Sequence, residues 1–159
     1  MENIAMIAAL VVLIAAEAYF VATTLLDFFP FNNIRESTSS ERRREVAVNS
    51  PGLVLPIILL CGSAAAHLPV LALAAGALEL VIGLGGVLLW WSPYLTGRSV
   101  PWATAGTDES WRELHGRIYA KTLIVLPPIG GRPRPNVEHM ILHALIIAGG
   151  VLAIVYGAQ

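Results

Sequence analysis

Four long apolar stretches, separated by polar segments, run along the chain at residues 4–26, 52–66, 70–91 and 137–156. A helix needs about 20 mostly apolar residues to cross the hydrocarbon layer of a bilayer, which is about 30 Å thick. The second stretch is short and needs residues 46–51 to complete its crossing. One bent helix through the second and third stretches would be far too long for a bilayer. The pattern therefore predicts four spans, at about residues 4–27, 46–66, 70–91 and 137–157.

The composition is that of a chain solvated mainly by lipid. Hydrophobic residues make up 56% of its 159 residues and charged residues only 13%, against about 25% charged in an ordinary soluble domain. We therefore expect one all-α transmembrane domain over residues 1–159, an integral membrane four-helix bundle. Its expected partners are membrane lipid and lipophilic small molecules, and not nucleic acid.

The positive charges predict how the chain is oriented in the membrane. Lys and Arg residues that flank a span are kept on the cytoplasmic side. Both loops that carry them are therefore expected in the cytoplasm, with the two termini and the turn at residues 67–69 on the non-cytoplasmic side. All ten basic residues lie in these two loops: Arg35, Arg42, Arg43 and Arg44, then Arg98, Arg112, Arg117, Lys121, Arg132 and Arg134.

Several residues mark the ends of the predicted helices. Ser39 or Ser40 is suited to cap a charged helical turn at residues 41–45 that runs into the second span. Pro93 is expected to end the helix of the third span. Asn136 is expected to cap the last span.

The long loop at residues 95–136 has a helical pattern of its own. Thr107 or Asp108 could serve as the N-cap, and the apolar residues from Trp111 onward fall on one face. We expect an amphipathic helix over about residues 108–126 that lies at the cytoplasmic interface. Two i,i+4 ion pairs are expected on its other faces, Asp108 with Arg112 and Glu113 with Arg117.

Two carboxyl groups fall near the middle of predicted spans. Glu17 lies in the first span and Glu79 in the third. An ionised carboxylate there is costly, and intramembrane ionisable residues are candidates for function. Each is either a proton acceptor or ligand contact inside the bundle, or a protonated acid with a structural hydrogen bond.

His139 and His143 are four residues apart at the start of the last span, so both rings leave the same helix face. Glu138 lies beside them in the first turn. This spacing can hold a metal, but only with a third ligand such as His115, Glu113 or Asp27. Hydrogen bonding or acid/base chemistry is the preferred interpretation, because the spacing of two histidines alone is a weak signal and the sequence does not show which residue would be the third ligand. Cys61 is the only cysteine, which excludes an intramolecular disulfide and paired-cysteine redox chemistry.

The densest group of reactive side chains lies at residues 111–119. His115 and Tyr119 are i,i+4 neighbours, and Arg112 and Arg117 could bind an anionic head group. The alternative is an interfacial helix whose arginines meet lipid phosphates and whose aromatic rings anchor it.

The start of the second span resembles the MAPEG family, the membrane-associated proteins of eicosanoid and glutathione metabolism. The resemblance consists of Glu41, Arg42, Asn49 and Pro56. It implies a trimer whose cytoplasmic clefts bind glutathione and conjugate or isomerise lipophilic substrates. The sequence differs from the family pattern at Glu45 and Gly52, where a basic and an acidic residue are expected.

Together these features predict a small membrane enzyme that acts on a lipophilic substrate in a cleft at the cytoplasmic interface. A polar head group or a thiol cofactor such as glutathione would be held by Arg42, Asn49, Arg112 and Arg117. Acid/base groups would be His115, Tyr119, His139 and His143, with Asp27 or Glu138 orienting a histidine. The alternatives are a non-enzymatic accessory subunit or scaffold and a transporter that uses Glu17 and Glu79.

Overall fold

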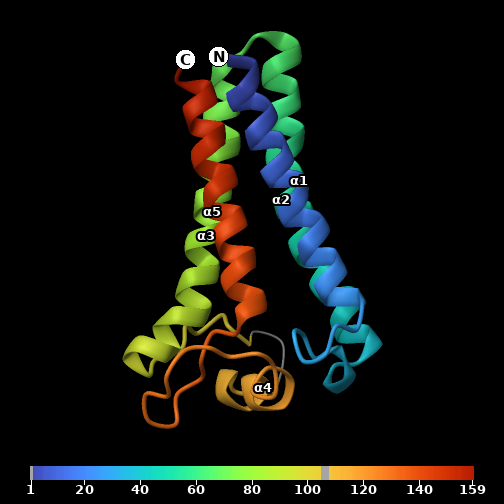
Figure 1. Ribbon diagram of the computed structural model, residues 1–159, viewed down its shortest axis with the longest axis vertical. Coiled ribbons are helices and arrows are strands. Elements are labelled where there is room, and N and C mark those ends of the chain that lie inside the picture. The colour runs from blue at the N-terminus through green and yellow to red at the C-terminus, as the bar shows by residue number, and fades with distance from the viewer. Residues whose placement is uncertain (1, 105–107) are drawn as a thin grey trace.

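In the computed structural model of the protein, residues 2–104 and 108–159 are described, and this part of the chain is all-helical. The elements are α1 (Glu2–Leu25), the 3-10 helix η1 (Ile34–Glu36), α2 (Ser39–Ala66), α3 (Pro69–Thr96), α4 (Trp111–Ile118) and α5 (Val137–Gly157), shown in Figure 1. The helices α1, α2, α3 and α5 are long and apolar enough to cross a membrane. The predictions of an all-α fold and of four long apolar helices are therefore confirmed.

The four long helices form a bundle in which each has two neighbours. α1 packs against α2 and α5, and α3 packs against the same two helices. Both ends of the chain and the α2–α3 turn lie at one end of the bundle, and α4 lies at the other (Figure 1). All ten basic residues belong to the loops and helix ends on the α4 side. We refer to this as the polar end.

Large apolar side chains cover the outside of the bundle. Ile4 on α1 is 72% exposed and Val81 on α3 is 66% exposed, and every long helix presents similar residues. A surface of this kind would be unstable in water, because contiguous exposed apolar area promotes association. It suits helices surrounded by lipid.

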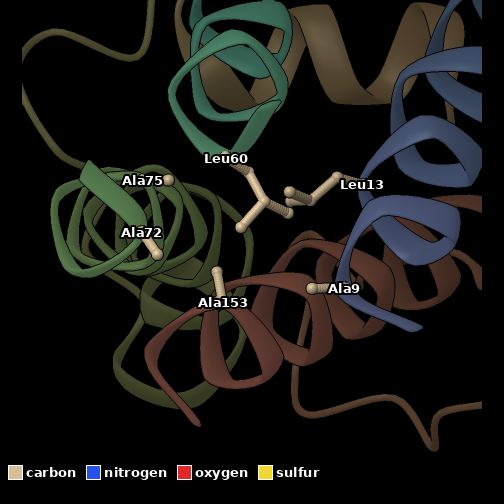
Figure 2. Packing of buried hydrophobic residues seen from close by; sticks show 6 residues of the cluster. All are labelled: Ala9, Leu13, Leu60, Ala72, Ala75 and Ala153. Atoms are coloured by element: carbon tan, nitrogen blue, oxygen red, sulfur yellow. The ribbon is translucent and has the colours of Figure 1, made fainter. Parts of the chain in front are cut away.

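Small residues dominate the interior at the end opposite α4. Four alanines pack there with two leucines (Figure 2), and the cluster consists of Ala9, Leu13, Leu60, Ala72, Ala75 and Ala153. Small side chains allow close approach of helix backbones, which replaces the hydrophobic effect as the source of packing energy within a membrane. α3 and α5 approach closely at Gly76, where an added Cβ would lie 2.6 Å from the Gly150 carbonyl oxygen.

Capping residues explain where α2 and α5 begin. The N-cap of α2 is Thr38, whose hydroxyl accepts from the Glu41 backbone N–H while the Glu41 carboxylate accepts from the Thr38 N–H. The prediction of Ser39 or Ser40 as the cap is therefore wrong by one or two positions, because this reciprocal pair needs a residue three places before the glutamate. Asn136 caps α5 as predicted, accepting from the His139 N–H.

α1 ends within two residues of its predicted end, whereas the end of α3 differs from the prediction. α1 ends at Leu25, and the buried Asn32 side chain donates to the free carbonyls of Thr23 and Leu26. α3 continues through Pro93 to Thr96, so the prediction that Pro93 ends it is wrong. A proline near a helix end loses one backbone hydrogen bond but leaves the following N–H groups free to bond. The helix instead closes where Gly97 adopts φ 77° and donates to the Pro93 carbonyl.

The loop helix α4 is shorter than the predicted range of residues 108–126. It starts after Ser110, which forms a capping box with Glu113. Of the two predicted caps, Asp108 does not cap α4 and Thr107 lies outside the described residues. α4 ends at Ile118, well before the predicted end at residue 126, and the backbone turns after Tyr119. Its position at a membrane interface stays a prediction.

The predicted ion pairs of this helix are replaced by other contacts. The Glu113 carboxylate accepts from Ser110, and Arg112 donates to the Gly131 carbonyl oxygen. Arg117 forms ion pairs at 2.6–2.8 Å with Glu109 and with Glu41 on α2. Arg112, Glu113 and Arg117 therefore bind partners in the loop and on α2 instead of their i,i+4 neighbours.

The close contact of α3 with α5 can be tested with glycine variants. Gly76→Ala should lower the free energy of unfolding by about 1–3 kcal/mol, because the new methyl group would press against backbone. Gly85→Ala is the matched control on the same helix, since a Cβ there meets nothing within 4 Å. Thermal unfolding of both variants in detergent, followed by circular dichroism, measures the difference. Equal stability of the two variants would contradict the packing described here.

Candidate functional site

A cleft of about 610 Å³ lies at the polar end of the bundle. Its walls come from α2, α3 and α5, with contributions from α4 and residues 102–104. In Figure 1 the α1–α2 pair separates from the α3–α5 pair toward this end, and α4 lies beneath the separation. A volume of this size suits a drug-sized or lipid-like molecule.

The lining of the cleft is amphipathic. Leu53, Ile82 and Ile146 line it deep in the bundle, whereas Arg44 and Glu45 line it at the first turns of α2. Because polar and apolar parts follow one another along the helices, the cleft matches a molecule with a polar head and an apolar body.

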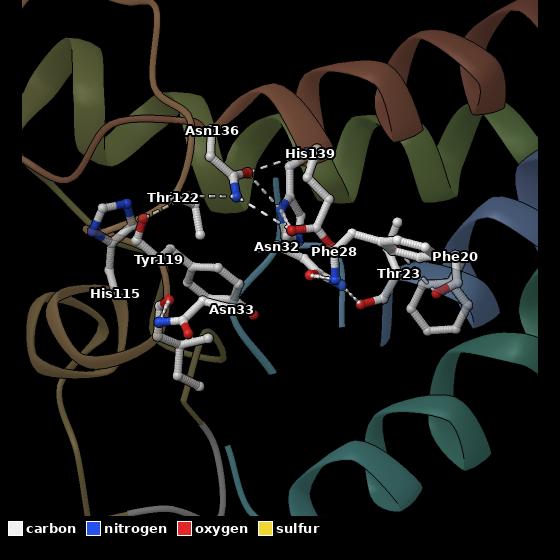
Figure 3. Close-up of polar contacts among 12 residues, drawn as sticks. Phe20, Thr23, Phe28, Asn32, Asn33, His115, Tyr119, Thr122, Asn136 and His139 are labelled. Carbon is white, nitrogen blue, oxygen red and sulfur yellow. Dashed lines mark hydrogen bonds and ion pairs between the residues drawn. The ribbon is translucent and has the colours of Figure 1, made fainter. Parts of the chain in front are cut away.

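His139 is held in one orientation by Asn136. The His139 ring nitrogen Nδ1 lies 2.8 Å from the Asn136 Oδ1 atom, and Asn136 is 0% exposed. The Asn136 amide nitrogen donates to Thr122 and Glu138, which assigns its oxygen as the acceptor from His139. Nδ1 therefore carries the ring proton, and Nε2 keeps a lone pair with no hydrogen-bond partner among the described residues. Figure 3 shows Asn136 between Thr122 and His139.

Aromatic rings fix the plane of His139. The Trp90 ring stacks on it, with ring centroids 3.8 Å apart and an interplanar angle of 29°. Tyr119 presents its edge at a centroid distance of 5.2 Å. Trp111 in turn lies edge-on to Trp90 at 5.1 Å. All four residues line the cleft.

Tyr119 supplies a hydroxyl group beside His139. Burial raises the pKa of Tyr119 well above its ordinary value of 10, and the carboxylates of Glu45 and Glu138 raise it further. The phenol therefore stays protonated at neutral pH and can donate a hydrogen bond to a ligand in the cleft.

His143 lies one turn deeper on α5 and also lines the cleft. It is 6% exposed, and its Nδ1 atom has no hydrogen-bond partner among the described residues. A Cβ atom at Gly86 would lie only 2.5 Å from the His143 Nε2 atom. Because Gly86 has no side chain, it leaves the space beside α3 that the His143 ring occupies.

His115 does not line the cleft. Its Nε2 atom lies 2.8 Å from the Arg134 carbonyl oxygen and must donate, because a carbonyl can only accept. Burial lowers the pKa of His115, so the ring is neutral. Its ring packs behind Trp90, at a centroid distance of 5.8 Å. Through its hydrogen bond to Arg134, the His115 ring holds the backbone of the loop that precedes α5.

The other predicted residues divide between the cleft and the loops. Asn49 lines the cleft, and its amide nitrogen donates to the Glu45 carbonyl. Arg42 donates to the backbone carbonyls of Ile34 and Ser37. Arg112 and Arg117 are engaged by the contacts described above and do not line the cleft.

Of the two predicted orienting carboxylates, Asp27 lies elsewhere and Glu138 lies near His139 without a hydrogen bond to its ring. Asp27 pairs with Arg35 at 2.6 Å, and this guanidinium lowers the pKa of Asp27. Glu138 is buried, and its Oε2 atom lies 3.9 Å from the His139 Nδ1 atom. The His139 ring instead donates to the side-chain oxygen of Asn136, which was predicted only as a cap.

The structure thus brings together four of the predicted residues, Asn49, Tyr119, His139 and His143. Within residues 2–104 and 108–159, no three His, Cys, Asp or Glu side chains are placed to hold a metal ion. Sequence reasoning missed Trp90 and Gly86 as parts of the site. The paired glycines at residues 85–86 were a usable signal, because a ring on a neighbouring helix can occupy the space they leave.

The buried, neutral state of His115 predicts a pH dependence of stability. Because its pKa lies below 6.5 in the folded protein, the unfolded chain takes up the proton first as the pH falls. The stabilisation is therefore complete above about pH 6.5 and is lost at lower pH. His115→Gln keeps a donor for Arg134 but does not titrate, so its melting temperature should fall less than that of the wild type between about pH 7 and pH 5. Identical pH slopes would contradict this role of His115.

Comparison with known proteins adds no further constraint on the site. No family model, curated protein or solved structure matches the chain. The resemblance to the MAPEG family at residues 41–56 stays a prediction, and the assignment of the site rests on its own geometry.

Proposed function

We propose that the protein is a membrane enzyme that transfers a proton on a lipophilic substrate bound in the cleft. The observation that carries the proposal is the fixed tautomer of His139, which leaves a free Nε2 lone pair on a residue that lines the cleft. A base held in one orientation by a buried partner is typical of acid/base catalysis.

The substrate of this proposal is amphipathic. Its apolar body would lie against Leu53, Ile82 and Ile146, and its head group would lie near Arg44 and Asn49 at the polar end. Arg44 has no ion-pair or hydrogen-bond partner among the described residues, so its charge is available to a head group.

The proposed chemistry uses two groups. Nε2 of His139 accepts a proton from the substrate while the Tyr119 hydroxyl donates a hydrogen bond to the oxygen on which negative charge develops. The Asn136 oxygen at 2.8 Å stabilises the imidazolium that forms, and the Glu138 carboxylate at 3.9 Å adds a longer electrostatic contribution. Isomerisation of a lipid and addition of a thiol to one both contain such a step.

A thiol co-substrate such as glutathione is compatible with this cleft if residues other than the predicted Arg42 and Arg112 bind it. Arg42 and Arg112 are held by backbone carbonyls, so they are poorly placed to bind a carboxylate of the thiol. Asn49 and Arg44 would take that role, and His139 would deprotonate the thiol. The trimer that the family resemblance implies remains part of the same proposal.

Catalysis can be tested without knowing the substrate in advance. The purified protein is incubated with a total membrane lipid extract, with and without glutathione, and new products are measured by mass spectrometry. His139→Gln should lower the rate of product formation by about 100- to 10,000-fold, the usual contribution of a positioned base. Arg43→Gln is the control, because Arg43 is exposed and does not line the cleft.

The outcome also separates the enzyme from a scaffold. A non-enzymatic accessory subunit would give no products, and His139→Gln would leave its copurifying partner unchanged. If the His139→Gln variant forms products as fast as the wild type, His139 is not the base.

We also propose that the polar end faces the cytoplasm, because it carries all ten basic residues. Cysteines are introduced singly into a Cys61→Ala background and tested on intact cells with a membrane-impermeant maleimide. Leu68→Cys, at the opposite turn, should be labelled from outside. Ser40→Cys and Gly116→Cys, at the polar end, should be labelled only after the membrane is opened. Labelling of Ser40→Cys and Gly116→Cys from opposite sides would contradict the arrangement of the spans.

A further inference from the structure

Glu79 is completely enclosed in the bundle, with 0% of its surface exposed. Both of its carboxyl oxygens are shielded from solvent, and neither has a hydrogen-bond partner within the part of the chain that the structure describes. Glu79 does not line the cleft, so it belongs to a different part of the molecule. Buried polar atoms are nearly always satisfied, and one that protein atoms leave unsatisfied calls for a bound group.

A second carboxyl group interacts with Glu79. Glu17 on α1 is within electrostatic range of it, and the Glu17 Oε2 atom is also buried without a partner among the described residues. Residues 50–66 of α2 and 144–157 of α5 contain no acidic or basic side chain. Their titratable residues are Cys61, which is exposed, and Tyr156, which is half-buried against the alanine-rich cluster.

Packing excludes a basic side chain from this position. Gly76 and Gly83 flank Glu79 by about one turn on either side, and both face α5 closely. A Cβ atom at Gly83 would lie 3.1 Å from the side chains of Ile146 and Ile147, and one at Gly76 would meet the α5 backbone. The helices therefore close around the carboxyl group. A proton is the smallest cation that can neutralise it there.

We propose that Glu79 is a proton-binding site inside the membrane, with Glu17 as its neighbouring carboxyl group. An ionised carboxylate with neither a cation nor a hydrogen-bond donor is strongly disfavoured in hydrocarbon, and binding a proton removes the charge. Two carboxylates within electrostatic range also repel each other, which favours a proton on at least one of them. The site is independent of the cleft and of the enzyme function proposed above.

Infrared spectroscopy of the full-length protein in lipid vesicles tests the proposal. A protonated carboxylic acid has a C=O stretching band that is separate from the amide and carboxylate bands. At neutral pH the exposed carboxylates are ionised, so the wild type should show this band and Glu79→Gln should lose the component that belongs to Glu79. Glu17→Gln should keep that component at a shifted frequency, because the neighbour of Glu79 has changed. Glu113→Gln, an exposed residue of α4, is the control and should leave the band unchanged.

Each other result counts against the proposal. A wild-type spectrum without the band at neutral pH, or one that Glu79→Gln leaves intact, would show that Glu79 holds no proton. Loss of the band when sodium chloride replaces choline chloride would show that the site takes a metal cation instead. If Glu79→Gln does not fold, Glu79→Asp serves in its place, and its band must shift in frequency.

Discussion

Hydrocarbon offers no hydrogen-bond partner, and the rest of this structure depends on that constraint. The four long helices satisfy their own backbone groups and leave apolar side chains outside, so irregular chain is confined to their ends. The connecting segments at residues 26–38, 97–104 and 108–136 lie at the polar end, where their carbonyls accept hydrogen bonds from Asn32, Arg42 and Arg134. The cleft lies at the boundary between these two regions, which is why its lining changes from apolar to charged.

Asn136 connects the fold to the chemistry at this boundary. Its oxygen caps α5 and binds the His139 ring, and its amide nitrogen binds Thr122 in the loop and Glu138 on α5. One buried amide thus fixes where the helix begins, where the loop lies and which ring nitrogen of His139 is basic. A fully buried polar side chain is tolerated there because all of its hydrogen-bonding atoms are used.

Much of the fold could be predicted from the sequence, because apolar periodicity and capping residues act locally. The spans and the Asn136 cap belong to this class. The site could be predicted only in part: the spacing of His139 and His143 placed them on one face, but nothing local showed that Trp90 stacks on that face. Arg42 and Arg112 resemble free head-group ligands in the sequence, yet each is bound by a carbonyl whose position depends on the path of a loop. Likewise, Glu113 and Arg117 have the spacing of an ion pair but find partners on other segments.

Arg117 joins three segments that are far apart in the sequence. Its guanidinium binds Glu109 before α4, Glu41 on α2 and the backbone carbonyl of Glu36 in η1. Glu41 also lines the cleft, as do Trp111, Leu114 and Ile118 of α4, so this guanidinium ties together two walls of the cleft. The position of α4 and that of this part of α2 are therefore not set independently: the same ion pair anchors both.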